Sequence, residues 1–446
     1  MLAVRKIVSR GRPTWGVLVC VLAGVSAYSG VNAQLRIEIT RGVDRPVPMA
    51  IVPFGWEGSS GEAPFDLTGL ISTDLRQSGR FDPLEERDMV SQPTQPADIA
   101  FQDWRILDVD VLVIGQIFEM GPDQYAVSFQ LFDVLRGEQL LGYRLTSAGD
   151  ELRVTGHRIA DMIFEALTGI PGVFSTRIAY VSQQGDGDDS RYRLIVSDID
   201  GANRQIVADS PEPLMSPAWS PDSRKLAYVS FEGDHSAIYI QTLRTGVRDR
   251  VSAREGINGA PVFSPDGRKL ALTLSRDQGN LDIYMLDLAG QVLTRLTRDT
   301  AIDTEPAWAP DGESIFFTSD RGGGPQVYRV ATRLGARVQR VTYEGSYNAR
   351  PRISPDGKQL VVIHRVRDSY RIAVVDPETG LTQVLSNGTL DESPSFAPNG
   401  AQIIYATRER GVGVLSSVST DGRIHRQIAS AAGDVREPAW SPFPRI

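Results

Sequence analysis

The chain has 446 residues, 41% of them hydrophobic, and a formal net charge of −8, which fits a globular protein of two or three domains. An export signal at its start carries four basic and no acidic residues, so the mature charge is −12. This acidic balance argues against a nucleic-acid binder or a protein of anionic membrane surfaces.

Residues 1–33 have the pattern of a cleaved secretory signal peptide. Basic residues precede an apolar run at 15–27, and Val-Asn-Ala at 31–33 offers a small-x-small cleavage site before Gln34. The run is too short, and too interrupted by glycine, for a membrane anchor, and Cys20 has no proper lipobox around it. Because Cys20 is the one cysteine, the mature chain cannot form a disulfide, and we expect a soluble exported protein with no membrane span.

Residues 34–168 alternate between strand and helix patterns and predict an α/β domain. Strand patterns occupy 35–39, 49–54, 109–118, 125–134 and 139–145. Helical patterns occupy 67–75, where Gly79 can end the helix, and 152–167, which Gly169 and Pro171 stop.

From residue 169 onward a segment of about 44 residues repeats. Its leading prolines are 44, 45, 45, 43 and 44 residues apart: Pro217, Pro261, Pro306, Pro351, Pro394 and Pro438. In four of the five full copies a Trp or Phe follows, then in each a turn of the Ser-Pro-Asp-Gly type, an apolar strand and two more polar strands. Four short strands in each period predict one blade of a β-propeller.

The two ends of the repeat region complement each other. The strand at 178–181 lacks the preceding turn, whereas the copy at Pro438 lacks the following strand. An open solenoid would instead need polar capping repeats. The sequence therefore predicts an α/β domain at 34–168 and a six-bladed β-propeller at 169–446, closed by both of its ends.

Catalytic and metal-binding patterns are missing from the sequence. There is no G-x-S-x-G elbow, and His157, His235, His364 and His425 are too scattered for a metal site. His157 and Asp161 lie one helical turn apart, which favours a local surface or helix-packing pair over a catalytic one. The acidic run at 186–189 favours a solvated loop, and the repeated Trp and Phe residues favour the core. We expect no enzyme activity, cofactor or metal.

The residues before each leading proline differ from blade to blade, although structural need alone would tend to make them alike. They are Met215 and Ser216, Gly259 and Ala260, Thr304 and Glu305, Ala349 and Arg350, Glu392 and Ser393, and Arg436 and Glu437. We expect them at the entry of the central channel as a small, polar partner-binding rim, with Arg350 and Glu392 among the contacts. The acidic members could also hold a cation.

Short motifs along the chain resemble the TolB family of the Tol-Pal system. The resemblance runs from Gln34 to the C-terminus, and the α/β domain joined to six such blades makes it specific. Its motifs include ITRGVD (39–44), VPF (52–54), DLRQSGRF (74–81), GVFSTRIAYV (172–181), PLMSPAW (213–219), NGAP (258–261), TEP (304–306) and VSTDGR (418–423).

The resemblance implies a non-catalytic periplasmic protein that supports outer-membrane integrity and envelope constriction in cell division, and that some bacteriocins exploit. It implies that the propeller's channel face binds the lipoprotein Pal through Asn258, Gly259, Ala260, Thr304 and Glu305. Ile257 stands where some members have His, which alters one contact. The resemblance also implies that the mature N-terminal segment binds TolA through Gln34, Leu35, Arg36, Ile37, Glu38, Ile39 and Thr40.

The segment from Gln34 to Thr40 alternates apolar and polar residues, and Gly42 follows as a hinge. Such a strand can dock on its own protein or join a partner's sheet edge, so we hypothesise a switch linked to Pal binding. Two other classes stay open: a secreted propeller peptidase or lactonase, and a wall- or sugar-binding propeller. We expect a monomer.

Overall fold

The computed structural model describes residues 45–444, apart from 60, 186, 234, 277, 278, 429 and 431 and the side chains of 188 and 276. The predicted signal peptide, the segment Gln34–Thr40 and Gly42 lie outside the described residues. Within the described range, the helices are too short or too polar to cross a bilayer.

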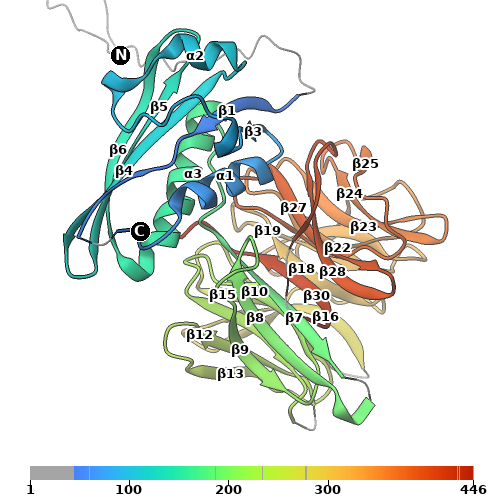
Figure 1. The fold of residues 1–446 in the computed structure, drawn as a ribbon. Helices are drawn as coiled ribbons and strands as arrows, with labels where there is room; N and C mark the ends of the chain where they lie inside the picture. The colour runs from blue at the N-terminus through green and yellow to red at the C-terminus, as the bar shows by residue number, and fades with distance from the viewer. Residues whose placement is uncertain are drawn as a thin grey trace, which may run out of the picture. The chain divides into compact units, whose positions relative to one another are not determined.

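The N-terminal domain is an α/β layer structure built on one mixed sheet, with α1 and α3 lying side by side (Figure 1). Parallel pairing joins β1 to β3 and to β4, β2 also pairs with β4, and β4, β5 and β6 form an antiparallel meander. The strands are β1 (Val47–Ile51), β2 (Gly55–Glu57), β3 (Phe81–Pro83), β4 (Val111–Gly121), β5 (Gln124–Asp133) and β6 (Glu138–Ala148). The helices are α1 (Leu67–Gln77), α2 (Phe101–Ile106), α3 (Leu152–Thr168) and the 3₁₀ turns η1 (Glu86–Asp88), η2 (Pro96–Asp98) and η3 (Gly149–Glu151).

Local chemistry fixes the two long helices of this domain. The Asp66 side chain accepts a hydrogen bond from Gly69 N and caps α1, and α3 ends at Gly169, whose φ of 71° suits glycine. α3 approaches α1 closely at Gly156, where a Cβ atom would lie 2.8 Å from Leu70 Cδ2. The predicted pattern missed α2, whose fully buried Trp104 packs with residues of β1 and β4.

The rest of the chain forms six four-stranded antiparallel sheets, which confirms the predicted propeller. Blade 1 consists of β10 (Leu214–Trp219), β11 (Lys225–Ser230), β12 (Ala237–Thr242) and β13 (Arg248–Ser252). Blade 2 consists of β14 (Asn258–Phe263), β15 (Lys269–Arg276), β16 (Asn280–Asp287) and β17 (Leu293–Arg295). Blade 3 consists of β18 (Asp303–Trp308), β19 (Ser314–Ser319), β20 (Gln326–Ala331) and β21 (Gln339–Arg340). Blade 4 consists of β22 (Asn348–Ile353), β23 (Leu360–Val366), β24 (Ser369–Val375) and β25 (Thr382–Val384). Blade 5 consists of β26 (Glu392–Phe396), β27 (Gln402–Glu409), β28 (Val412–Ser419) and β29 (His425–Ile428). Blade 6 consists of β30 (Asp434–Trp440), β7 (Arg177–Gln184), β8 (Arg191–Asp198) and β9 (Gln205–Ser210). The 3₁₀ turn η4 (Gly187–Asp189) lies between β7 and β8.

The repeated turn and the repeated aromatic residue have the predicted structural roles. In blade 2, Ser264 Oγ donates to Asp266 Oδ1 at 2.6 Å, and Gly267 adopts a φ of 72°. The Trp and Phe after the leading prolines are buried, and two tryptophans also link blades. Trp219 Nε1 donates to the carbonyl of Ala439, and Trp308 Nε1 donates to that of Val262, each on the preceding blade.

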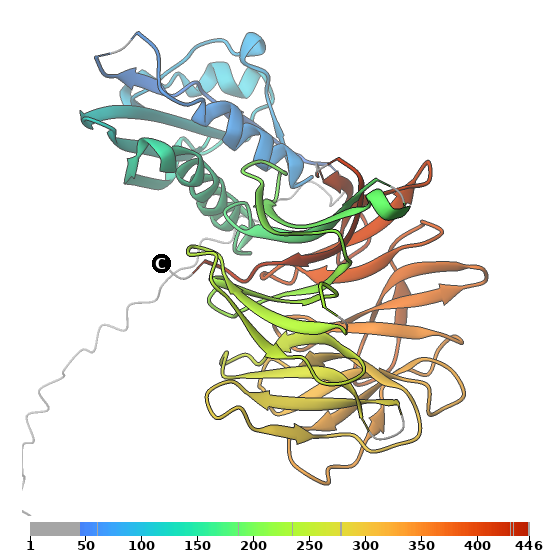
Figure 2. The same cartoon turned by 90° about the horizontal axis from the view of Figure 1, so that it is seen from below.

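Both ends of the propeller build its sixth blade. β30 pairs antiparallel with β7, so that Trp440 lies opposite Ile178, and Figure 2 shows red β30 beside the green strands. Arg177 N donates to Ser441 Oγ at 3.0 Å, and Ser441 N donates to Arg177 O at 2.8 Å. Inner strands contact one another in the closed order β10, β14, β18, β22, β26, β30 and back to β10. Closure leaves no unpaired edge at the junction of first and last blades.

Deleting Pro438 to the C-terminus should abolish cooperative folding or cause aggregation. The deletion removes the buried Trp440 and leaves Ile178 and Ala179 at the edge of β7 without their strand partners. Deletion of residues 443–446 alone is the matched control, because it spares Trp440 and Ser441. A longer truncation that melts at the same temperature as the control would contradict ring closure.

Candidate functional site

The residue before each leading proline adopts a left-handed backbone conformation in all six blades. These residues are Ser216 (φ 52°), Ala260 (46°), Glu305 (54°), Arg350 (55°), Ser393 (56°) and Glu437 (54°). A β-bulge occurs at the same place, where two residues of the inner strand face one residue of its neighbour. Left-handed non-glycine residues are strained and cluster at functional sites, so this ring is the leading candidate.

Charged members of this ring contact one another across blades. Glu437 Oε2 accepts a hydrogen bond from Ser216 N and lies 3.1 Å from Arg350 Nη2. Glu305 Oε2 accepts a hydrogen bond from Arg350 N at 2.9 Å. Burial alone would lower the pKa of Arg350, but the charges of Glu437, Glu305 and Glu392 outweigh burial and raise it. The structure thus brings three predicted site residues, Glu305, Arg350 and Glu392, into one electrostatic cluster.

The side chain of Asn258 is fully buried, unlike the partner-facing contact that the sequence suggested. Its Oδ1 accepts from Ser252 Oγ at 2.7 Å and from Arg254 N at 3.0 Å, while Nδ2 donates to Arg254 O at 2.7 Å. These bonds fix the loop before β14. Asn258 therefore positions its neighbours, half-exposed Ile257 and partly buried Gly259.

The same position is a buried amide or carboxylate in three further blades. Asp303, Asn348 and Asp391 each stand three residues before a leading proline, and each is fully buried. Asp303 accepts two hydrogen bonds of 2.8 Å from Arg321 Nη2. Sequence analysis missed this set, although its fixed spacing from the prolines was a usable signal.

Large apolar side chains are exposed beside the channel entry, so the expectation of a small, polar rim was wrong. We call Met215, Ile257, Ile302 and Leu390 the apolar rim; their exposed fractions are 41%, 50%, 48% and 38%. Three of them directly precede a buried Asn or Asp of the inner strands. Predicted site residues Gly259, Ala260, Thr304 and Glu392 are partly buried at the starts of these strands, and the predicted segment Gln34–Thr40 lies outside the described residues.

The α/β domain, together with the segment that follows it at Pro171, contacts the opposite end of the blades. Arg426 Nη2 donates to Gln77 Oε1 at 2.6 Å, and Asn399 Nδ2 donates to Pro171 O at 2.9 Å. Asn399 lies in the turn between the first and second strands of its blade, and Arg426 follows the turn between the third and fourth. Such turns lie at the end of an antiparallel blade away from the loops that precede the inner strands. These contacts therefore leave the channel entry uncovered.

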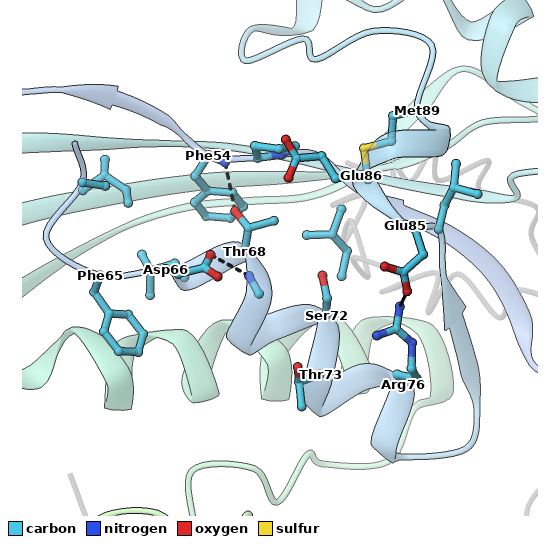
Figure 3. Close-up of a pocket in the computed structure, with 17 residues that line it drawn as sticks. Phe54, Phe65, Asp66, Thr68, Ser72, Thr73, Arg76, Glu85, Glu86 and Met89 are labelled. Atoms are coloured by element: carbon cyan, nitrogen blue, oxygen red, sulfur yellow. Dashed lines mark hydrogen bonds and ion pairs between the residues drawn. The ribbon is translucent and has the colours of Figure 1, made fainter. Parts of the chain in front are cut away.

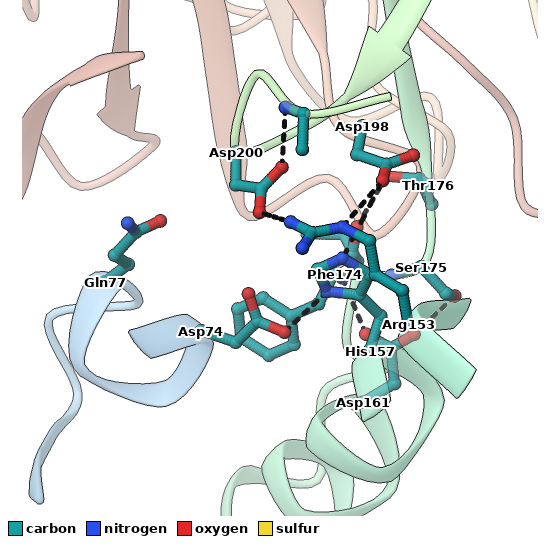
Figure 4. Close-up of polar contacts among 12 residues, drawn as sticks. Asp74, Gln77, Arg153, His157, Asp161, Phe174, Ser175, Thr176, Asp198 and Asp200 are labelled. Carbon is teal, nitrogen blue, oxygen red and sulfur yellow. Dashed lines mark hydrogen bonds and ion pairs between the residues drawn. The ribbon is translucent and has the colours of Figure 1, made fainter. Parts of the chain in front are cut away.

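A partly buried charged cluster joins the two domains (Figure 4). Arg153 of α3 contacts Asp198 at 3.2 Å and forms a short ion pair with Asp200, both from blade 6. His157 Nδ1 lies 2.6 Å from Asp74 Oδ2 of α1, and its Nε2 lies 3.9 Å from Asp198 Oδ2. The guanidinium of Arg153 already supplies a positive charge between the two blade carboxylates. This compensation disfavours reading His157, Asp198 and Asp200 as a metal site, although their ligand atoms lie within 4.8 Å of one another.

The structure corrects the predicted pairing of His157 with Asp161. His157 is almost fully buried and pairs with Asp74, 83 residues earlier in the chain. Burial alone would lower the pKa of His157, but the bond to Asp74 and the charges of Asp200 and Asp198 outweigh burial and raise it. Burial raises the pKa of Asp74 more than the hydrogen bond and charge of His157 lower it.

Asp161 holds the segment that leads into the propeller. Its carboxylate accepts hydrogen bonds from Phe174 N at 2.6 Å, Ser175 N at 3.2 Å and Ser175 Oγ at 2.5 Å. Burial nevertheless raises the pKa of Asp161 from 3.8 to about 6. The residue therefore works as a structural acceptor.

The α/β domain has a cavity of about 420 Å³ beside α1 (Figure 3). Its polar groups already contact one another: Thr68 Oγ1 accepts from Phe54 N at 3.0 Å, and Arg76 Nη2 pairs with Glu85 at 2.9 Å. Met89 and Phe54 line part of its wall. None of these bonds points to a particular ligand.

Fold and site define the class: a six-bladed propeller with an α/β domain at one end and a strained, charged channel with an apolar rim at the other. Family profiles described as the TolB amino-terminal domain and the TolB beta propeller domain match residues 35–140 and 164–444. The Tol-Pal system protein TolB of Thioalkalivibrio sulfidiphilus is 50% identical over 93% of this chain and 95% of its own length. That of Nitrosococcus oceani is 50% identical over 95% of this chain and 97% of its own.

A crystal structure of TolB from Acinetobacter baumannii has a TM-score of 0.81 and 42% identity, and the match covers 90% of this chain and 97% of that one. The chain therefore belongs to the TolB family of the Tol-Pal system. The names of these relatives indicate no catalytic activity.

Asp161→Asn should flatten the dependence of stability on pH between about pH 4 and 6. Because the folded pKa is raised, the wild-type contribution is full below pH 3.8 and is lost as pH rises through about 6. The loss should reach roughly 2–3 kcal/mol. The variant should also be less stable overall, since an amide NH₂ cannot accept from Ser175. Urea unfolding from pH 4 to 7.5 measures both effects, and parallel curves for the two proteins would show that Asp161 does not titrate in this range.

Proposed function

We propose that this chain is a non-catalytic periplasmic protein that binds the lipoprotein Pal at the propeller channel and TolA through residues 34–40. In this role it supports outer-membrane integrity and envelope constriction during cell division, and bacteriocins can exploit the same surfaces. The observation that carries the Pal proposal is the ring of six strained residues, whose side chains differ among blades although their backbone is the same.

The channel entry has the composition of a protein-binding surface. Exposed Ile257 and Ile302 supply apolar area, and Glu305 and Arg350 supply a charged centre. Binding energy in protein interfaces concentrates in such a centre once surrounding apolar contacts exclude water. The contacts of the α/β domain lie at the other end of the blades, so a partner can approach without displacing that domain.

Two features of the sequence support the TolA proposal and the periplasmic location. The pattern of residues 1–33 directs export, and residues 34–40 alternate as a strand that can add to a partner's sheet edge. Membership of the TolB family of the Tol-Pal system agrees with both.

Glu305→Ala should weaken binding of lipid-free Pal by about 1–3 kcal/mol, because it removes a central charge of the proposed interface. Glu305 Oε2 also accepts hydrogen bonds of 2.9 Å from Arg350 N and Thr318 Oγ1, so truncation frees the Thr318 hydroxyl proton and leaves Arg350 N with Thr318 Oγ1 as its acceptor. Alanine tolerates the left-handed backbone here, as Ala260 does at the same position in blade 2.

Glu305→Gln is the matched control, since it keeps an oxygen acceptor and loses only the charge. Calorimetric titration with Pal and melting curves should be recorded for all three proteins. Unchanged affinity with matched melting temperatures would place Glu305 outside the interface.

Deleting residues 34–40 should abolish TolA binding and leave Pal binding unchanged or tighter. If Pal binding favours release of this segment, thermodynamic reciprocity requires that the deletion strengthen Pal binding by the same coupling, typically about 1–3 kcal/mol. Calorimetric titration with TolA and with Pal measures the two affinities. Full TolA affinity in the deleted protein would eliminate the segment as the TolA site.

A further inference from the structure

Two residues further along the inner strands lies a second ring of positions. These residues directly follow the leading prolines: Ala218, Val262, Ala307, Arg352, Ser395 and Ala439. Five of the six are small or apolar, and Arg352 is the one charged member. A guanidinium in such a ring has lost much of its water and needs another source of hydrogen-bond acceptors.

Arg352 lines a cavity of about 160 Å³ together with residues from five of the six blades. Arg350 lines the same cavity, but Glu437 compensates its charge at 3.1 Å. Arg352 Nη1 donates to Pro351 O at 2.8 Å, and among the described residues no carboxylate lies within ion-pair distance of it. The guanidinium has five N–H donors, so this one bond leaves most of its donor capacity available.

The electrostatic environment of Arg352 agrees with a positive charge that is not compensated. Burial and the neighbouring positive charge of Arg350 lower the pKa of Arg352 to about 10, even though Glu305 and Glu437 act in the opposite direction. A nearby anion would oppose both effects, whereas a cation would add to the repulsion.

Two hydroxyl groups line the same cavity and can donate hydrogen bonds. Ser393 Oγ is buried and makes no hydrogen bond with any of the residues that the structure describes. Ser395 Oγ accepts from Trp440 N at 3.0 Å, which leaves its own proton free to donate. A buried hydroxyl without a partner costs free energy, and such a group in a polar cavity indicates a bound species.

We propose that this cavity is an anion site in which Arg352, Ser393 and Ser395 bind one small carboxylate-type oxyanion. The cavity volume of about 160 Å³ has room for a carboxylate group together with water. Either a free anion or an Asp or Glu side chain of an inserted partner could supply that chemistry. Arg350 and Glu437 of the charged cluster also line this cavity, but they compensate each other at 3.1 Å, which leaves the guanidinium of Arg352 for the anion.

Acetate is the probe, measured by calorimetric titration into the mature protein in a HEPES buffer of constant ionic strength. We expect one site per chain in the wild type, and binding at least about tenfold weaker in Arg352→Met, because a charge-assisted hydrogen bond is lost. Ser393→Ala should weaken binding by a smaller factor. Arg268→Met, which removes an exposed charge from a turn of blade 2, is the control and should bind as the wild type does.

Equal acetate binding by the wild type and Arg352→Met, or no binding by the wild type, would overturn the proposal. Crystals of the wild type grown in bromide give an independent test that needs no variant. Anomalous density beside Arg352 supports the site, and a channel without bromide while surface sites are filled argues against it. Neither test uses Pal or TolA, so a negative result for the anion site can be distinguished from a failure of the proposed function.

Calorimetric titration with Pal, at zero and at saturating acetate, then distinguishes a free anion from a carboxylate side chain of the partner. Competition between acetate and Pal would show that a partner carboxylate enters the site. Unchanged Pal affinity would show that the resident ligand is a free anion.

Discussion

Pairing of β30 with β7 is the interaction on which the rest of the propeller depends. It joins residues more than 250 positions apart, and it completes both the ring and the channel. β30 brings Glu437 to Arg350 across the channel, while β8 of the same blade ends at Asp198, which contacts Arg153 of the α/β domain. One blade thus carries the closure, part of the channel chemistry and part of the domain contact, so these properties cannot be lost independently.

The channel combines a regular backbone with irregular side chains. Six left-handed residues before proline store strain that each blade must compensate through its own packing and hydrogen bonds. Buried side chains such as Asn258 and Asp303 bond the loops that lead into this bulge. Because the backbone is fixed in this way, the side chain at each position can vary with little effect on the fold. Specificity can therefore change while the propeller stays the same.

Charged side chains are partly buried at both ends of the blades, and their charges are compensated differently. Between the domains, Arg153 faces Asp198 and Asp200, and removing one member would leave a partly buried charge without its partner. In the channel, Arg350 has Glu437, whereas Arg352 has a single backbone carbonyl. The two arginines lie on one strand but differ in role: Arg350 belongs to an ion pair, and Arg352 is available to a ligand.

The sequence by itself determined the propeller, its blade number and its closure, since the 44-residue period, the turn residues and the complementary ends can all be recognised in the sequence. It also located the variable positions before each proline. Tertiary structure decided what those patterns could not: His157 pairs with Asp74 rather than with Asp161, and Asn258 turns inward. It also decided that, among the described residues, Arg350 has a carboxylate within ion-pair distance and Arg352 does not. Burial and pairing depend on which distant strands and helices meet, and a local pattern carries no information about a partner that is far away in the chain.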